Sequence, residues 1–507
     1  MKSADRPILT FDCGTTSVRA IIFDVEGRSL GVAQQEFAQH FPQPGWVEHD
    51  AAEIWTAALA CGRGALRAAN LAARDIAGIA ITNQRETAVI WDRASGQPIA
   101  PAIVWQDRRT ASRLAALREA GHADEVLAQT GLRLDPYFSA SKFEWMLDHV
   151  PGARARAERG ELAAGTIDSW ILWNLTAGRV HATDASNASR TMLAQITNGA
   201  CVWSDALCAL FRVPRAMLGS IVDTAGFVGD SHPDHIGAAI PITGIVGDQQ
   251  AALYGQQCLQ VGAAKCTFGT GCFLLANAGS RSATPPSGLL ATVAWQIDGS
   301  VTYAMEGSVF IGGSAVQWLR DGLGFIARAS EVDALAAGVP DSGGVVVVPA
   351  LTGLGAPWWD AEARGAVFGL TRGSTKAHLA RATLEGVAHQ VADLVEAIEA
   401  GGVPIAALRV DGGAAASDVL LQAQADLTGI PVERPRVLES TALGAAFLAR
   451  RGLVGAAAAI GVAPVLERRF DPALSASRRE ALRDGWRRAV LAVRQFGSSL
   501  SHGEHAS

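Results

Sequence analysis

Three short loops, each with glycine and either aspartate or threonine after an apolar stretch, are the feature that most constrains how this sequence can fold. They lie at residues 11–17, 268–271 and 410–413, so both halves of the 507-residue chain carry them. The first follows a run of β-forming residues at 8–11. Small residues let backbone N–H groups approach a polyphosphate, and threonine hydroxyls add donors. The pattern predicts a nucleotide held between two domains, without a Walker A sequence, which does not occur in this chain.

Length and composition narrow the class of protein. At 507 residues the chain exceeds one ordinary core, so we expect two large domains. Charged residues make up 18% and the formal net charge is −6, without blocks of lysine or arginine, which argues against nucleic acid as the main partner. We expect neither a secretory leader nor a membrane span. Seven cysteines without a C-x-x-C pair indicate reduced thiols in a cytoplasmic protein.

The two halves of the chain repeat one order of elements. Strands are expected at 8–11, 18–24, 30–37, 76–82, 88–91, 244–247, 262–268, 271–277, 291–297, 302–306 and 408–410. Helices are expected at 51–73, 249–254, 308–320, 375–400 and 417–428, with a last one starting near Thr441. Each half therefore opens with a glycine and threonine turn between strands and later adds helices. This duplication predicts an α/β fold with domains at 1–256 and 257–507 and a ligand cleft between them.

Asp248 is the candidate general base. It follows the apolar strand that ends at Gly247 and stands at the start of a helix. Phosphoryl transfer to an alcohol needs a carboxylate near the acceptor hydroxyl, while positioning and electrostatics supply most of the remaining catalysis. The alternative interpretation is a helix N-cap, which is a common place for aspartate.

A second group of side chains could bind a small polyol. Arg85 and Glu86 are adjacent between two expected strands, where one could donate to a hydroxyl and the other accept from its neighbour. Trp105, Tyr137 and Phe273 could form an apolar wall against a short carbon chain. The alternatives are a surface ion pair for the first two and ordinary core packing for the aromatic residues.

The loop residues also have two interpretations. Asp12 and Asp411 could position Mg²⁺ or water, but aspartate is equally common in Asx-type turns, and threonine in the equivalent hydroxyl turns. The joint occurrence of three loops favours the functional interpretation. A G-x-S-x-G sequence at 27–31 is not a hydrolase elbow, because Ser29 lies between two β-type runs and the elbow needs a strand-to-helix turn.

Taken in order, these residues resemble the FGGY carbohydrate kinases over nearly the whole chain. The resemblance is carried by segments 44–50, 81–87, 102–106, 135–139, 183–191, 247–253 and 353–386. Segment 83–87, with Trp105 and Tyr137, is most similar to the members that phosphorylate glycerol. The resemblance implies two actin-like ATPase domains of the ribonuclease H-like type, each with a mixed sheet, around an interdomain cleft. It also implies ATP-dependent phosphorylation of glycerol to sn-glycerol 3-phosphate in glycerol catabolism.

The same resemblance assigns residues to ligands. It implies a glycerol pocket lined by Arg85, Glu86, Trp105, Tyr137, Asp248, Gln249 and Phe273, with Asp248 as the base. It implies Mg²⁺ near Asp12 and ATP phosphates facing Thr15, Thr16, Ser17 and Arg19. It implies a nucleotide held by Thr270, Gly313, Gln317, Gly413 and Ser417. Closure of the domains would exclude water, and a homo-oligomer of two or four copies is expected.

Two positions and one segment depart from the family pattern. Cys13 stands where glutamine is expected and would put a reactive thiol near the phosphates, while Ser417 stands where an adenine-side asparagine is expected. Segment 231–237 lacks the glycine- and arginine-bearing loop that binds fructose 1,6-bisphosphate in some bacterial members, so we do not expect that form of inhibition.

Two other hypotheses stay open. One is a kinase for another small polyol or sugar, against which the bulky Trp105 and Phe273 argue. The other is an actin-like ATPase that is not a kinase, which would have no need for Arg85, Glu86 and Asp248 in one small pocket.

Overall fold

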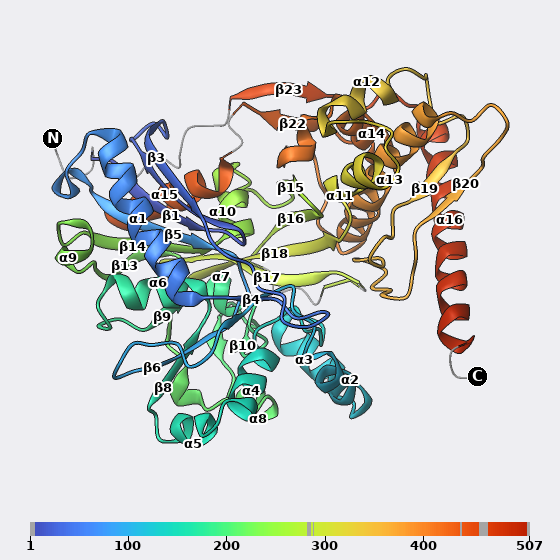
Figure 1. Cartoon of the computed structure of the whole chain (residues 1–507). Coiled ribbons are helices and arrows are strands. Elements are labelled where there is room, and N and C mark those ends of the chain that lie inside the picture. Colours follow the sequence, from blue (N-terminus) through green and yellow to red (C-terminus); the bar gives the residue numbers. More distant parts are fainter. Residues whose placement is uncertain (1–5, 281–284, 287, 437–438, 456–464, 504–507) are drawn as a thin grey trace.

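A 13-stranded mixed sheet runs through the molecule (Figure 1). The computed structural model describes residues 6–280, 285–286, 288–436, 439–455 and 465–503. The strands of this sheet, in chain order, are β1 (Ile8–Cys13), β2 (Ser17–Phe23), β3 (Ser29–Glu36), β5 (Gly78–Asn83), β13 (Ala225–Asp230), β14 (Pro241–Gly247), β15 (Ala264–Phe268), β16 (Cys272–Gly279), β17 (Leu290–Ile297), β18 (Ser300–Val309), β21 (Leu408–Asp411), β22 (Val432–Pro435) and β23 (Leu466–Phe470). Their spatial order is β23-β22-β21-β15-β16-β18-β17-β13-β14-β5-β1-β2-β3.

The sheet contains the same pattern twice. In the first half β1 pairs antiparallel with β2 and parallel with β5, which pairs parallel with β14. In the second half β15 pairs antiparallel with β16 and parallel with β21, which pairs parallel with β22. An antiparallel strand flanks each array, β13 beside β14 and β23 beside β22. The structure confirms the expected duplication. The two halves of the sheet join where β13 pairs with β17, through Ala225 and Ile297.

Helices cover both faces of the sheet (Figure 1). They are α1 (Ala51–Ala69), α2 (Ala111–Glu119), α3 (Ala123–Thr130), α4 (Ala140–His149), α5 (Ala153–Glu158), α6 (Ile167–Leu175), α7 (Ala185–Ala188), α8 (Asp205–Leu210), α9 (Pro233–Ile236), α10 (Asp248–Gly255), α11 (Gly313–Gln317), α12 (Val332–Ala336), α13 (Lys376–Ala400), α14 (Asp418–Thr428), α15 (Ser440–Val454) and α16 (Ala476–Gly503). Asp50 caps α1 by accepting the N–H groups of Ala52 and Glu53 at 2.8 and 3.3 Å. The helix ends earlier than predicted because Asn70 adopts a left-handed conformation with φ of 54°.

A smaller layer hangs below the first half of the sheet in Figure 1. It contains α2 to α5, α8 and most of the short strands, packed around buried residues such as Phe138, Phe143 and Phe211. The short strands of the molecule are β4 (Glu48–His49), β6 (Val89–Asp92), β7 (Ala102–Ile103), β8 (Leu162–Gly165), β9 (Ala182–Asp184), β10 (Ala194–Gln195), β11 (Val202–Trp203), β12 (Ser220–Val222), β19 (Val346–Val348) and β20 (Ala366–Phe368).

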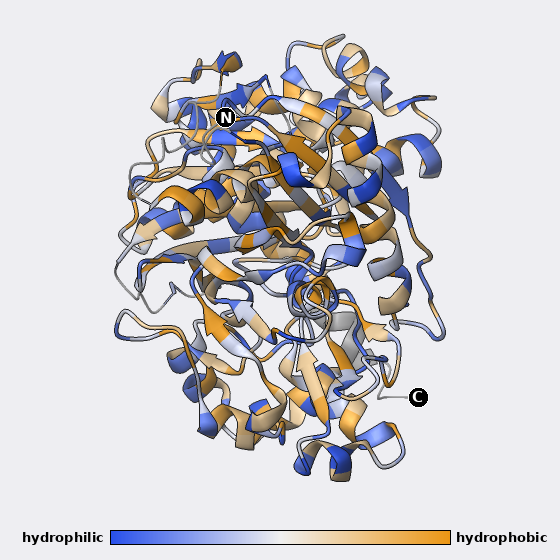
Figure 2. Cartoon of the chain, turned by 90° about the vertical axis from the view of Figure 1, so that its left-hand side faces the viewer, coloured by the Kyte–Doolittle hydropathy of each residue, from blue (hydrophilic) through white to orange (hydrophobic). Residues whose placement is uncertain are grey.

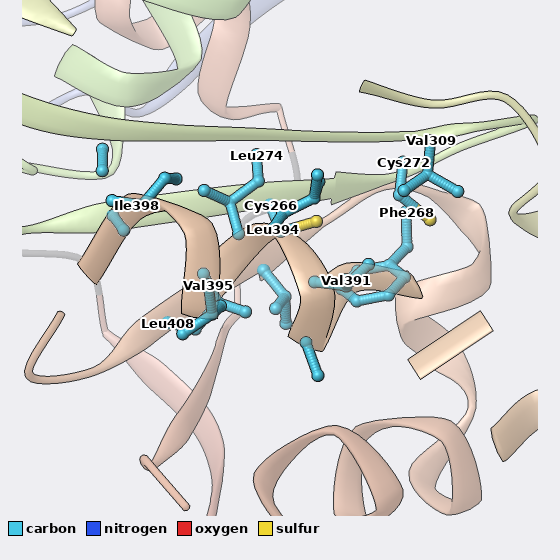
Figure 3. Close-up of a cluster of buried hydrophobic side chains, with 14 of the residues drawn as sticks. Cys266, Phe268, Cys272, Leu274, Val309, Val391, Leu394, Val395, Ile398 and Leu408 are labelled. Carbon is cyan, nitrogen blue, oxygen red and sulfur yellow. The ribbon is translucent and has the colours of Figure 1, made fainter. Parts of the chain in front are cut away.

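Apolar side chains fill the space between the sheet and its helices. Figure 2 shows hydrophobic residues along the central strands and hydrophilic residues on the outer helices and loops. In the second half, Leu394, Val395 and Ile398 of α13 pack against Cys266 and Leu274 on the strands (Figure 3). Burying such side chains contributes about 1.5–3 kcal/mol each, which makes this contact a main source of stability for the second half.

Helix α15 comes late in the chain but packs on the first half of the sheet, against β14, β5 and β1. One hydrophobic cluster accordingly mixes early residues such as Ile8 and Val246 with Phe447 of α15. The helix also crosses α10 at very short range, since a Cβ added to Gly444 would lie 1.9 Å from the carbonyl oxygen of Ala251. Glycine is therefore required at this crossing, and α15 fixes the helix that begins with Asp248.

The prediction that the helix near Thr441 is the last one is wrong. That helix is α15, and β23 and the long α16 follow it. Among the described residues, no helix is both long and apolar enough to cross a membrane. All seven cysteines are buried free thiols.

Candidate active site

Asp248 is the first residue of α10, directly after β14. The N-cap alternative is wrong, because Gly247 occupies the cap position. The backbone N–H of Gly247 donates to Ser186 Oγ at 2.9 Å, which fixes the chain immediately before the carboxylate. Asp248 Oδ1 accepts the N–H of Gln249 at 2.7 Å and lies 3.3 Å from Arg85 Nε, and the side chain stays 30% exposed. The Asp248 carboxylate is therefore held in place by these contacts while a ligand can still reach it.

Arg85 and Glu86 belong to a buried network of four charged side chains. Arg85 binds Glu306 with both terminal nitrogens, at 2.6 and 3.1 Å. Arg190 completes the network by donating to Glu86 at 2.6 Å and to Glu306 at 3.0 Å. All four side chains are at most 2% exposed, so the surface ion pair alternative is wrong. Glu306 comes from β18 in the second half, so the network ties the two halves together at this point.

Burial and pairing act against each other on the acids of this network. Burial acts to raise the pKa of Glu306, but Arg190 and Arg85 outweigh it and lower that pKa to about 2. Burial raises the pKa of Glu86 in spite of the same two arginines. For Asp248 burial also raises the pKa, opposed by Arg85 and Lys265 and supported by the negative charge of Asp12. The site therefore contains one firmly ionised acid and two that bind protons more readily than usual.

Three aromatic rings stand beside these charges. The Trp105 ring makes edge contacts with Tyr137 and Phe273, at centroid distances of 5.6 and 6.4 Å. Trp105 Nε1 donates to Thr15 Oγ1 at 3.0 Å. The three rings expected to form an apolar wall therefore lie together, and Trp105 links that wall to the first loop.

The first loop joins β1 to β2. Its turn is closed by Gly14 N–H donating to the Ser17 carbonyl at 3.0 Å, while the Thr16 side chain is exposed. Asp12 is buried and its Oδ2 accepts from Arg19 Nη2 at 2.9 Å, so its carboxylate does not close an Asx turn. Arg19 also reaches Glu439 of the second half at 2.7 Å. The residues predicted to face the phosphates therefore lie together in the turn between β1 and β2 and at the start of β2. They are Thr15, Thr16, Ser17 and Arg19.

The second and third loops pack directly on each other. Gly412 has φ of +87°, and a Cβ there would lie 2.6 Å from the Phe268 carbonyl oxygen. Gly313 N–H donates to the Gly269 carbonyl and Gly312 N–H to the Thr270 carbonyl, both at 2.8 Å.

Three positions in or beside these loops face open space or solvent. A Cβ added to Gly413 would meet nothing within 4 Å, and Thr270 is exposed. Gln317 is exposed one turn after Gly313 on α11. Because Gly413 has no side chain and lies beside open space, a nucleotide could approach the backbone closely at this position.

The side chains of Ser417 and Asp411 both form hydrogen bonds within the protein. The Ser417 hydroxyl caps α14 by accepting Leu420 N–H at 3.0 Å, and it also donates to Asp333. Asp411 Oδ2 accepts from Gln256 at 2.7 Å and from Ser440, so it does not close an Asx turn, and its Oδ1 is buried without a partner among the described residues. Ser417 has little left to offer a base.

Cys13 is not a reactive thiol. Its side chain is fully buried and belongs to the core of the first half, because side chains alternate along β1 and Asp12 takes the opposite face. Burial raises the pKa of the Cys13 thiol well above its usual range, and the charge of Asp12 adds to this. Since the thiolate is the reactive form, the thiol stays inert.

Asp12 and Asp248 are the carboxylates that fit a divalent cation. Arginine holds both carboxylates in place, Asp12 Oδ2 through Arg19 at 2.9 Å and Asp248 Oδ1 through Arg85 at 3.3 Å, and the negative charge of Asp12 adds to the raised pKa of Asp248. Mg²⁺ is usually bound by one or two carboxylates together with substrate phosphates. Among the described residues there is no group of three or more metal-binding side chains, so any cation here would depend on the phosphates.

Sequence reasoning missed Arg190, Glu306, Lys265 and Ser186. Glu306 and Lys265 are single charged residues within strands that are mostly buried, which is a usable signal because a buried charge needs a partner. Arg190 and Ser186 lie within segment 183–191, whose polar residues gave no periodic pattern to interpret.

Comparisons with known proteins agree with this architecture. Residues 7–255 match the N-terminal domain and residues 264–453 the C-terminal domain of the FGGY family of carbohydrate kinases. A glycerol kinase of Aromatoleum aromaticum is 57% identical, with 96% of this chain and 98% of that protein covered.

Two solved structures extend the comparison. The structure of Plasmodium falciparum glycerol kinase with ADP superposes with a TM-score of 0.90 at 31% identity, covering 96% of this chain and 98% of that one. A xylulose kinase from Rhodospirillum rubrum gives 0.86 at 25% identity, covering 97% and 100%. The chain belongs to the FGGY family of carbohydrate kinases.

Proposed function

We propose that this protein transfers the γ-phosphoryl group of ATP to a terminal hydroxyl of glycerol, forming sn-glycerol 3-phosphate and ADP. The observation that carries the proposal is the convergence of Arg85, Glu86 and Asp248 beside a wall of three aromatic rings. The sequence similarity to glycerol kinases over nearly the full length supports the same substrate.

The pocket suits a small molecule with neighbouring hydroxyl groups. The carboxylate of Glu86 accepts from one hydroxyl, and the guanidinium of Arg85 donates to another. Gln249 adds an amide next to the base. Trp105, Tyr137 and Phe273 lie together where they would cover a short carbon chain, and the bulk of Trp105 and Phe273 argues against a larger sugar. Because Arg85 and Glu86 are both held by buried partners, the polyol is oriented by groups that do not need to rearrange.

Asp248 acts as the general base. Its carboxylate takes the proton of the attacking hydroxyl, whose oxygen forms a bond to the γ-phosphorus while the bond to the bridging oxygen of ADP breaks. Burial makes the Asp248 carboxylate a better proton acceptor by raising its pKa, and Arg85 at 3.3 Å keeps it oriented. A positioned base of this kind contributes about 10²–10⁴ in rate.

ATP lies between the halves in this proposal. Thr15, Thr16, Ser17 and Arg19 face its phosphates, and Thr270, Gly313, Gln317 and Gly413 hold the nucleotide, with Ser417 at the margin. Asp12 holds Mg²⁺. When bound, Mg²⁺ neutralises and orients the phosphate oxygens. Residues 1–256 then bind polyol and phosphates and residues 257–507 bind the nucleotide. Positions 1–5, 281–284, 287, 437–438, 456–464 and 504–507 lie outside the described residues. The buried free thiols suit the cytoplasm, where we place the enzyme.

The test is ADP release from Mg·ATP with glycerol, dihydroxyacetone, erythritol, xylulose and ribulose supplied separately. A strong preference for glycerol is expected. Turnover only with a longer substrate would favour another kinase activity of the family, to which the similarity with a xylulose kinase structure gives weight. ATP hydrolysis that none of these substrates stimulates would favour an actin-like ATPase without kinase activity.

A further inference from the structure

Lys265 is a buried cation that the mechanism above does not use. It lies on β15, fully buried, and its ammonium group donates to two side chains, Gln249 Oε1 and Thr267 Oγ1, the latter at 2.8 Å. β15 and α10 belong to different halves of the molecule. The contact with Gln249 therefore brings a cation of the second half to the residue next to the base.

The chemistry of an ammonium group fixes the direction of this contact. A lysine ammonium has three donors and no acceptor. The Gln249 amide must therefore turn its carbonyl oxygen toward Lys265, which leaves its NH₂ group facing away. Among the described residues, that NH₂ group donates to no protein acceptor. Gln249 is thus held as a hydrogen-bond donor beside Asp248, which is an acceptor.

A second buried lysine shows what a structural role looks like. Lys142 donates to the backbone carbonyls of Pro136, Tyr137 and Phe138 at 2.7, 2.6 and 3.1 Å, and so ties down one loop. Lys265 instead contacts two side chains. Burial lowers the pKa of Lys265, and the carboxylates of Asp411 and Asp248 oppose this shift. The charge of Lys265 is therefore stabilised by Asp411 next to the third loop and by the proposed base Asp248.

We propose that Lys265 is a positioning residue of the polyol pocket, which locks the Gln249 amide with its NH₂ group toward the substrate. The inference rests on the proposed function and deepens it. In the locked arrangement, Asp248 accepts the proton of the reacting hydroxyl while Gln249 donates to the oxygen of a second hydroxyl. A substrate needs two oxygens spaced to meet both residues at the start of α10.

The test is steady-state kinetics of the full chain with Lys265→Met, Gln249→Leu and the double variant. Lys265→Met keeps the length of the side chain but removes every donor. Losing a hydrogen bond to the non-reacting hydroxyl should raise KM for glycerol about five- to tenfold with kcat changed less than about twofold. Because Lys265 acts through Gln249, the double variant should match Gln249→Leu alone. Cys266→Ala is the control, since it alters the same strand on its core face and should lower Tm without moving KM.

Unchanged KM in Lys265→Met, or losses that multiply in the double variant, would overturn the inference. If Lys265→Met does not fold, Gln249→Glu decides. Its carboxylate still binds Lys265 but offers only acceptors to the substrate, so KM should rise as in Gln249→Leu, and a KM like that of the unaltered protein would refute the lock. Glycerol turnover by the unaltered protein tests the proposed function separately.

Discussion

Replacing Glu306 with glutamine should lower the stability of the protein more than the loss of a surface ion pair would. The Glu306 carboxylate accepts three hydrogen bonds from two buried arginines, Arg85 at 2.6 and 3.1 Å and Arg190 at 3.0 Å. Glutamine keeps the size of the side chain but removes its charge and turns an NH₂ group toward one of the guanidinium groups. Two buried cations are then left with too few acceptors.

The magnitude follows from the pKa of Glu306. The folded protein lowers that pKa from an ordinary 4.5 to about 2. At 1.36 kcal/mol for each pH unit, the ionised form gains about 3 kcal/mol from its surroundings in the folded state. Removing one partner of a buried ion pair typically costs 3–5 kcal/mol, which agrees. For a domain of this size, about 3 kcal/mol corresponds to a fall in Tm of roughly 6–12 °C.

The assay is thermal unfolding of Glu306→Gln between pH 3 and 8, beside Glu480→Gln as control. Glu480 forms an exposed pair with Arg487 at 2.7 Å, and its loss should leave Tm nearly unchanged. Because the folded pKa of Glu306 is depressed, its contribution is complete above about pH 4.5 and is lost as pH falls toward 2. The Tm difference should therefore shrink in acid. A Tm shift no larger than that of the control would refute the reasoning.

Three further predictions address the reaction and the nucleotide site. Asp248→Asn should lower kcat about 10²–10⁴-fold and spare nucleotide binding, measured by ADP release and by titration calorimetry, and retained turnover would remove Asp248 as the base. Because the base must be ionised and its pKa is raised by burial, kcat/KM should fall with decreasing pH around a midpoint above 3.8, and a midpoint at or below that value would contradict the assignment. Gly412→Ala should lower Tm, because its Cβ would lie 2.6 Å from the Phe268 carbonyl oxygen. Gly413→Ala has free space and should keep Tm while weakening ADP binding, so equal Tm losses in the two variants would be evidence against the packing described here.

Most strands of the large sheet were predictable because their signals are local, but β13, β22 and β23 were missed. The hairpin of β1, β2 and β3 has glycine and aspartate turns between apolar runs, and the strands β15 to β18 repeat this arrangement. Helix α16 was missed although Leu482, Trp486, Ala489 and Val493 follow helical spacing, because arginines interrupt the apolar residues throughout the segment.

The site was predictable only in part. The residues that bear the proposed chemistry lie next to glycine turns or strand ends, so their sequence neighbourhoods reveal them. Their supports do not: Glu306 and Arg190 are separated from Arg85 by 221 and 105 positions, and only the folded sheet brings them together. Ser417 was assigned to the nucleotide from the family resemblance alone, and the sequence did not reveal that its hydroxyl caps α14.

The place of α15 has a consequence for how the protein is made. The face of the first sheet formed by β1, β5 and β14 is covered by residues 440–454, which leave the ribosome near the end of synthesis. Until then Ile8, Ala80 and Val246 have no cover from this helix. The apolar face of the nascent first half therefore stays exposed until α15 has been synthesised. A fragment truncated before residue 440 should aggregate or bind chaperones rather than fold alone.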